Sequence, residues 1–339
     1  MLILRPIAET DLESLVDLAR QLDSLNLPSD RDFLEGRIRA SLRSFGRQLD
    51  DWREGIYVFV LEDADTARCV GTSTILAKQG RLGVPYFWLG VTTEERRSAE
   101  LDRRFVHTKL QLFSTEDGPT EIGGLILDPA YRRSREKCGK ALSIVRLAYI
   151  SRHPDRFERE VIAEMLSPFE ESGENLLWNA FGAQFTGLGY SEADRLSASN
   201  KQFIADLFPR DPVYATLFPE SVQAIIGKTE AKAAVAILEK VGFRYLHQVD
   251  PFDGGPYYGA ARDAIASVRD RRRLVLPGLP FEGIEPSEGA LALLSAEGQF
   301  GFRAIVVPLD PEGAPRVQKE CREALGVVAG DEVVVTPLP

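Results

Sequence analysis

The stretch Thr120–Ile150, TEIGGLILDPAYRRSREKCGKALSIVRLAYI, decides how the rest of the chain is organised. It opens with a short apolar run that Asp128 and Pro129 end, which is typical of a buried strand. From Gly139 onward the apolar residues recur at helical spacing. A loop crowded with basic side chains lies between the two. A strand, a basic loop and a helix N-terminus together present backbone N–H groups and positive charge to an anion.

The same loop has a plainer interpretation, because a run of arginines is also typical of a solvated surface. The Walker pattern and the dinucleotide glycine fingerprint are both missing from it, which disfavours nucleotide phosphate sites of those two kinds. A pyrophosphate-sized anion site and a solvated face therefore both stay open on this stretch alone.

Composition limits the classes to which the chain can belong. Its 339 residues suffice for one large domain or for a domain with a smaller partner. We expect a cytoplasmic protein without a membrane segment or a signal peptide, because no apolar run approaches spanning length. Cys69, Cys138 and Cys321 lack disulfide or metal spacing, so we expect no metal site. A formal charge of −10 argues against nucleic-acid and anionic-membrane partners and suits a cationic substrate.

Six phrases along the chain, taken in order, carry a resemblance. They are LILRPIAETDLESLVDLA (2–19), YVFVLED (57–63), LILDPAYRR (125–133), FIADLFPRDPVY (203–214), ILEKVGFRY (237–245) and DPFDGGP (250–256). With the arginine-containing loop, they make the chain similar to the arginine N-succinyltransferase family within the GNAT superfamily of N-acyltransferases. The resemblance implies succinyl transfer from succinyl-coenzyme A to the α-amino group of L-arginine, a step of arginine catabolism. It also implies a direct transfer in a ternary complex, with acyl-coenzyme A as a co-substrate and no permanently bound cofactor.

The expected fold is α/β (α+β): a GNAT-like mixed, mainly antiparallel sheet flanked by helices. Residues 1–276 form the acyltransferase domain in this interpretation. A helical insertion at about 186–227 has prolines that divide it into short helices. Residues 277–339, rich in glycine, proline and short β runs, form a small β-rich C-terminal subdomain. Such an appendage can pack on the main domain or on a partner, so we expect a homo-oligomer or a hetero-oligomer with a related subunit.

The resemblance also assigns the coenzyme site. The loop from Arg132 to Lys140 is expected to hold the pyrophosphate, and Leu125 to make a backbone contact with the acyl-coenzyme A. The predicted coenzyme-binding residues are Leu125, Ile126, Leu127, Arg132, Arg133, Arg135, Lys137, Cys138, Gly139 and Lys140. Relatives have a tighter loop with more glycines than RRSREKCG, so this loop departs from the family pattern. Cys138 is not expected to act as a nucleophile, because direct transfer does not need one.

Three residues are candidates for the acceptor site. Asp253 is our first choice for pairing with a guanidinium, although its turn can also be only a turn. Glu164 ends a predicted strand beside the coenzyme strand and can orient a cation or lie solvated. Asn26 belongs to a loop near the acceptor end of the family's site, or to a plain turn between helices.

The proton-transfer residue of the family, a histidine, has no counterpart in IIGKTEAKAAVAILEKVGF (225–243). Matching from Gly227 places Glu230 at its position, and a carboxylate can act as a base if burial raises its pKa. His247, in a predicted strand, is the alternative, while His153 is expected in an exposed turn.

Three interpretations remain. The protein succinylates arginine; or it acylates another amine or uses another acyl group; or it is a non-catalytic subunit that supports an active paralogue.

Overall fold

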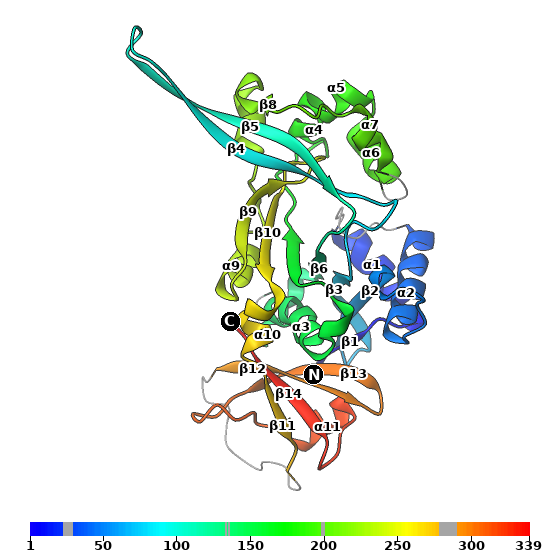
Figure 1. The fold of residues 1–339 in the computed structure, drawn as a ribbon. Coiled ribbons are helices and arrows are strands. Elements are labelled where there is room, and N and C mark those ends of the chain that lie inside the picture. The colour runs from blue at the N-terminus through cyan, green and yellow to red at the C-terminus, as the bar shows by residue number, and fades with distance from the viewer. Residues whose placement is uncertain (23–29, 133, 135, 198–200, 278–289) are drawn as a thin grey trace.

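The computed structural model describes residues 1–22, 30–132, 134, 136–197, 201–277 and 290–339, and Figure 1 shows their arrangement. One sheet runs through this part of the chain. Its strands are β1 (Leu2–Pro6), β2 (Ile56–Asp63), β3 (Arg68–Leu76), β4 (Tyr86–Ser98), β5 (Arg103–Thr115), β6 (Thr120–Leu127), β7 (Glu160–Glu164), β8 (Val213–Tyr214), β9 (Arg244–Val249), β10 (Pro256–Ala261), β11 (Arg272–Val275), β12 (Leu291–Gly298), β13 (Gly301–Pro308) and β14 (Glu332–Pro337).

The sheet order is β11-β14-β12-β13-β1-β2-β3-β6-β7-β10-β9-β4-β5-β8. Among the described strands, each neighbouring pair is antiparallel except β6 and β7. This confirms the mixed, mainly antiparallel sheet that we predicted from the sequence.

The parallel pair β6–β7 is short. It consists of Thr120 opposite Val161 and Glu121 opposite Ile162, after which the two strands continue unpaired with each other. The strand after the central helix therefore leaves the strand before it, as expected for a GNAT-like sheet. The separation opens toward the carboxyl ends of both strands, where the basic loop begins.

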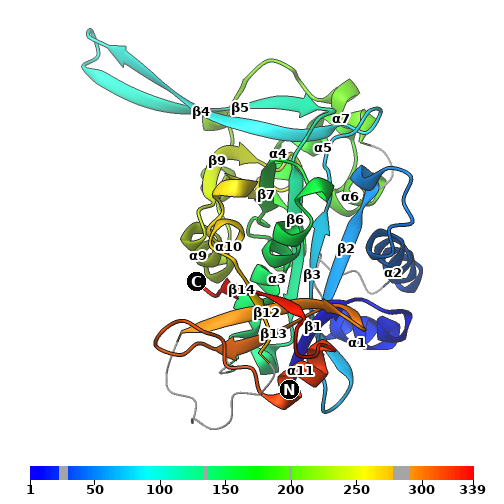
Figure 2. The same ribbon diagram turned by 60° about the horizontal axis from the view of Figure 1, so that its bottom comes forward.

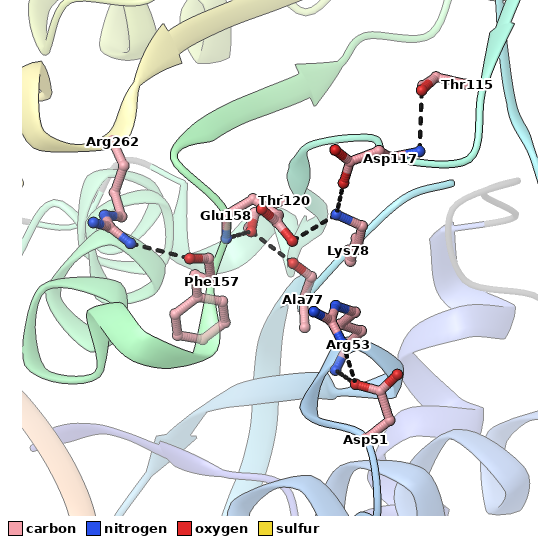
Figure 3. A network of polar contacts seen from close by, with 10 residues as sticks. All are labelled: Asp51, Arg53, Ala77, Lys78, Thr115, Asp117, Thr120, Phe157, Glu158 and Arg262. Carbon is pink, nitrogen blue, oxygen red and sulfur yellow. Dashed lines mark hydrogen bonds and ion pairs between the residues drawn. The ribbon is translucent and has the colours of Figure 1, made fainter. Parts of the chain in front are cut away.

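A polar network fixes the closed end of this separation (Figure 3). The Lys78 ammonium pairs with Asp117 at 2.5 Å and with Glu158 at 2.6 Å. The Thr120 hydroxyl donates to the Ala77 carbonyl at 2.6 Å and accepts from the Glu158 amide at 2.8 Å. These contacts tie β3, β6 and the segment before β7 together, so the strands part only beyond them.

Helices cover both faces of the sheet. They are α1 (Leu12–Leu22), α2 (Arg31–Phe45), α3 (Cys138–Arg152), α4 (Leu176–Ala180), α5 (Gly182–Thr186), α6 (Tyr190–Ser197), α7 (Gln202–Leu207), α8 (Glu220–Ile225), α9 (Lys232–Lys240), α10 (Ala266–Arg269) and α11 (Lys319–Leu325). Alternate side chains of β2 face the two helical layers, since successive side chains of a strand point to opposite faces of the sheet. Tyr57 and Phe59 pack in the cluster that contains α3, whereas Val58 and Val60 pack with α1 and α2. Figure 2 shows α3 on one side of the central strands and α1 and α2 on the other.

Helix α3 is buried on all sides, from Ala141 through Ser151. It has apolar residues around its whole circumference, because α9, α10 and the C-terminal strands cover the faces that the sheet leaves free. A helix held in this way fixes the position of the basic loop at its N-terminus.

Strands β4 and β5 form one long hairpin that projects from the body of the molecule in both views (Figures 1 and 2). The two strands pair from Tyr86 opposite Thr115 to Ser98 opposite Arg103. The sequence predicts the two strands but places a charged connection where the pairing in fact continues. At the base of the hairpin, Leu89 and Leu110 pack with the short helices that follow β7. After β7 the chain forms two short helices, α4 and α5.

The C-terminal strands extend the same sheet through β13, whose Ala304 pairs with Leu4 of β1. These strands also enclose a hydrophobic cluster of their own with α11. The proposed division between residues 276 and 277 stays a prediction. The expectation for His153 is wrong: the ring is buried against Tyr149, and its Nε2 lies 2.6 Å from Glu297 of β12.

In the described part of the chain, no helix is both long enough and apolar enough to span a membrane.

Candidate active site

Strand β6 contains a bulge at its middle. Thr72 of β3 lies opposite Ile126, but Thr74 lies opposite Gly123, so β6 has one residue more than β3 across this interval. Gly124 has φ +54°, a left-handed conformation that glycine adopts without strain. The Thr72 hydroxyl donates to the Gly124 carbonyl at 3.1 Å. The bulge thus turns the backbone just before Leu125 out of the regular ladder.

A buried arginine supports this bulge from α3. The Arg146 guanidinium donates to the Gly123 carbonyl at 3.1 Å and to the Ser143 hydroxyl at 3.1 Å. Burial lowers the pKa of Arg146 to about 9, and no ion pair joins it to a carboxylate of the described residues. A cation therefore lies against the backbone of the bulge at Gly123. The sequence did not reveal it, because the residues around Arg146 indicate only an apolar helix.

The N-terminus of α3 is open to an anion. The amides of Cys138 and Gly139 donate to no acceptor in the described residues, as is usual for the first turn of a helix. Lys137 precedes them with φ +54°, and Arg132 is exposed, with its Nε donating to the Leu127 carbonyl at 3.3 Å. Positive charge, and N–H groups without an acceptor among the described residues, thus lie where the resemblance places the pyrophosphate.

Lysines from two helices meet beside this turn. Burial and the nearby ammonium groups of Lys240 and Lys137 lower the pKa of Lys140. Lys140 also donates to the Pro339 carbonyl. Lys240, from the last turn of α9, is a basic residue that the sequence did not assign to the site. Cys138 is buried, and this burial raises the pKa of its thiol, which does not favour a nucleophile.

Acidic side chains gather at the mouth of the β6–β7 separation. Glu164 ends β7, and Asp250 and Asp253 belong to the turn between β9 and β10. One carboxylate oxygen of each lies within 4.8 Å of the others, a spacing that can accommodate a cation. The predicted residues Glu164 and Asp253 are thus together, and Asp250 joins them. The spacing of histidines, cysteines and acids in the sequence did not reveal this cluster.

Backbone amides hold two of the three carboxylates. Asp253 accepts from Ser167 N at 2.9 Å and from Gly255 N at 2.7 Å, one on each oxygen. Asp250 Oδ1 accepts from the amides of Phe252 at 2.7 Å and Asp253 at 3.1 Å. Burial, and then the charge of Asp250, raise the pKa of Asp253 to about 7.

Glu164 has a different environment. Tyr257 Oη lies 3.0 Å from Glu164 Oε2 and 3.2 Å from Asp250 Oδ2. Burial first, then Asp250 and other acids nearby, raise the pKa of Glu164 well above its usual value. The Tyr86 hydroxyl is buried beside Tyr257 without a hydrogen-bond partner in the described residues. A buried hydroxyl of this kind is available to a polar group of a substrate.

Charged residues of other elements border the cluster. Burial raises the pKa of Glu121, whose carboxylate accepts from the Gln79 amide. Burial lowers the pKa of Arg37 on α2, and the charge of Glu121 acts in the opposite direction. The Lys201 ammonium lies close enough to Glu121 and Glu164 to lower the pKa of both carboxyls.

Comparison with known proteins gives the family. The sequence pattern of the family described as "Arginine N-succinyltransferase beta subunit" matches residues 2–267. The chain is 34% identical, over 340 aligned positions, to the arginine N-succinyltransferase of Citrobacter koseri, with 98% of this chain and 96% of that one covered. The chain belongs to the arginine N-succinyltransferase family.

Two further relatives support the assignment of this chain to the arginine N-succinyltransferase family. The Salmonella paratyphi B arginine N-succinyltransferase is also 34% identical, over 98% of this chain and 96% of that one. The structure of arginine/ornithine succinyltransferase subunit AI from Pseudomonas aeruginosa superposes with a TM-score of 0.82 and 29% sequence identity, covering 100% of this chain and 99% of that one. The fold is therefore shared along the whole chain, including the C-terminal strands.

The remaining predicted residues of this family member are exposed or lie outside the described residues. Glu230 is exposed in the loop before α9, and Gly227 of that loop donates to the Gly254 carbonyl at 2.9 Å. His247 is exposed in a bulge of β9, with φ +55°. Their catalytic roles stay predictions. Asn26, Arg133 and Arg135 lie outside the described residues.

Proposed function

We propose that this protein transfers the succinyl group of succinyl-coenzyme A to the α-amino group of L-arginine. The observation that carries the proposal is the cluster of half-buried Glu164 and Asp250 with buried Asp253 at the mouth of the β6–β7 separation, near the bulge of β6. A cationic amine is attracted to this cluster, and an acyl group carried along the bulged strand lies next to it. The names of the relatives support succinyl as the acyl group and arginine as the amine.

The acyl donor lies between β6 and β7 in this proposal. The separation leaves backbone N–H and C=O groups of β6 and β7 unpaired with each other. These groups form hydrogen bonds with the amides of the pantetheine arm. The N–H groups of Cys138 and Gly139, with Arg132 and Lys137, hold the pyrophosphate. The backbone at Leu125 contacts the thioester, where Arg146 behind the bulge stabilises negative charge that develops on the carbonyl oxygen.

Both substrates bind together, and the amine attacks the thioester directly. Asp250 and Asp253 pair with the guanidinium and reduce the cost of burying it, while the attack requires the α-amine in its neutral form. From the sequence, Glu230 is the residue expected to accept the proton of the amine, and His247 is the alternative.

Selection of succinyl requires a partner for the free carboxylate of the acyl chain. Arg37 on α2 is suited to this role, because it is half-buried, borders Glu121 and forms no ion pair within the described residues. Arg146 is less suited, because its guanidinium already holds Gly123 and Ser143.

We also propose that the protein acts in the cytoplasm and in an oligomer, of its own copies or with a related subunit. The subunit designations of the family and of the Pseudomonas aeruginosa relative support an assembly.

Purified protein given succinyl-coenzyme A and L-arginine tests the function through the release of free thiol and the mass of the product. Arginine-dependent release is expected, and Arg132→Ala should raise the KM for the donor. Release with a different donor or amine would replace the proposed substrates. If no donor and amine pair gives release while coenzyme A still binds, the protein is a supporting subunit rather than an enzyme.

A further inference from the structure

The contacts around Tyr257 require an additional proton. Its hydroxyl lies 3.0 Å from Glu164 Oε2 and 3.2 Å from Asp250 Oδ2, and one hydroxyl hydrogen serves only one of them. The second contact is favourable only if one carboxyl is itself protonated. Asp253 lies within 4.8 Å of both carboxyls, and three carboxylates this close do not all ionise.

Hydrogen bonding identifies which carboxyl carries the proton. Asp253 accepts two backbone amides, and Asp250 accepts two on Oδ1, and such bonds stabilise the ionised form. Glu164 has a single hydrogen-bond partner in the described residues, Tyr257. The proton therefore belongs on Glu164, which donates to Tyr257 Oη, which in turn donates to Asp250.

We propose that Glu164 is the base that accepts the proton of the acceptor amine, with Tyr257 and Asp250 as positioning residues. The role rests on the proposed function. In the empty site Glu164 carries a proton, which leaves for solvent when the cationic acceptor binds. The ionised Glu164 then takes one proton from the α-ammonium group. The neutral amine forms the new C–N bond, the C–S bond breaks, and the amine's second proton passes to the departing thiolate.

Charged and polar groups of the neighbouring elements influence whether Glu164 carries this proton. Glu121 of β6 and the two aspartates of the β9–β10 turn favour the protonated form of Glu164, whereas Lys201 favours the ionised form. The buried Tyr86 hydroxyl also lies close to Glu164 and lacks a partner in the described residues. On α6, Tyr190 and Asp194 lie near the aspartates of the turn. An arriving cation enters a site with an excess of acids, which is why it displaces a proton.

Calorimetry of arginine binding, with coenzyme A present and no acyl donor, measures the displaced proton directly. Titrations at pH 8, where Asp253 is largely ionised, in two buffers of different ionisation enthalpy should give about one proton released per arginine. Glu164→Gln should bind arginine with release close to zero. It should lose transfer activity by about 100-fold or more, as removal of a general base does. Glu192→Gln, an exposed change on α6, is the matched control and should release the proton as the wild type does.

Tyr257→Phe and Glu230→Gln keep the proposal testable if Glu164→Gln fails to fold. Tyr257→Phe should retain arginine-dependent transfer but shift the pH at which kcat/KM rises, because it breaks the contact between the two carboxyls. Unchanged proton release and an unchanged pH profile in Glu164→Gln or Tyr257→Phe would overturn the proposal. So would a loss of the rise of kcat/KM with pH in Glu230→Gln alone.

Failure of this inference is distinguishable from failure of the function. A wild type that transfers nothing to arginine contradicts the function, whereas an active wild type with an unaffected Glu164→Gln contradicts only the base. All titrations contain EDTA, and wild-type transfer that EDTA abolishes would mean that the three carboxyls hold a metal cation instead of a proton.

Discussion

Asp253 illustrates how one residue can serve both the fold and the site. Both of its oxygens accept backbone amides, one from the segment after β7 and one within its own turn. The carboxylate that the sequence singled out for a guanidinium therefore also joins two parts of the chain. In the proposed function, the substrate cation meets the lone pairs that these amides leave free.

Replacement of Asp253 should have a stability cost that depends on pH. Asparagine has one acceptor oxygen, so Asp253→Asn leaves one buried amide unpaired and should cost about 1–3 kcal/mol at pH 5. In the wild type the pKa rises from 3.8 to about 7 on folding, so the native state binds more protons than the unfolded state between these values. Wild-type stability therefore falls through this window as pH rises, and the difference between the two proteins should shrink by pH 7.5. Urea unfolding at both pH values measures it, and a difference that grows with pH would contradict the account.

Arg37 should determine preference for the acyl group. We expect Arg37→Met to lower kcat/KM by about tenfold with succinyl-coenzyme A and by much less with acetyl-coenzyme A, which has no carboxylate to pair. Arg39→Met, an exposed change on the same helix, is the control. Equal losses with both donors would remove Arg37 from the donor site.

At the residue scale, the sequence indicated only part of the candidate site. It indicated Glu164, which ends a predicted strand, and Asp253, which lies in a predicted turn of aspartates and glycines. It missed Tyr86 and Glu121, since neither differs in pattern from an ordinary strand residue. Burial and proximity give these residues their properties, and both depend on the order of strands in the sheet.

Among the elements, β6 matters most to the chemistry. Its bulge requires Gly124 at φ +54°, and a Cβ there would lie 2.7 Å from Thr74 Oγ1. The basic loop and the helix after it follow from the sequence alone, because an apolar run, a proline and helical spacing mark their bounds. The bulge does not, because a pair of glycines in a strand is also compatible with a close approach of backbones.

Gly124→Ala should therefore destabilise the protein by about 1–3 kcal/mol and raise the KM for the acyl donor, since it strains the backbone that we propose contacts the thioester. Gly123→Ala is the matched control: its Cβ would meet only Glu121 Oε1, at 3.3 Å, and its φ is not in the left-handed region. Chemical unfolding and donor titration compare the two variants. Similar effects for both would show that the bulge has no special role.

For the whole molecule, the sheet continues from the acyltransferase part into the C-terminal strands. Leu293 and Leu294 of β12 are both fully buried, yet Leu293 packs in the cluster that contains α3 and Leu294 packs in the C-terminal cluster. Composition indicated a separate appendage, because glycine, proline and short β runs become frequent after residue 276. It could not indicate the pairing of β13 with β1, which joins residues about 300 positions apart.

Leu293→Ala and Leu294→Ala test whether this part folds with the rest. Each should cost about 2–5 kcal/mol, the usual effect of a large-to-small change in a core. If the clusters form one cooperative unit, both variants unfold in a single transition at a lower urea concentration. A separate early transition in Leu294→Ala, with thiol-releasing activity retained, would mean that the C-terminal strands fold independently.

The central claim is that a partly buried acid cluster near the bulged strand receives a cationic amine for acyl transfer. Thiol release from succinyl-coenzyme A, followed with and without L-arginine in wild type and in Glu164→Gln, tests it most directly. The account predicts arginine-dependent release in the wild type and a loss of about 100-fold or more in the variant. Release that is independent of arginine, or that survives unchanged in Glu164→Gln, would contradict it.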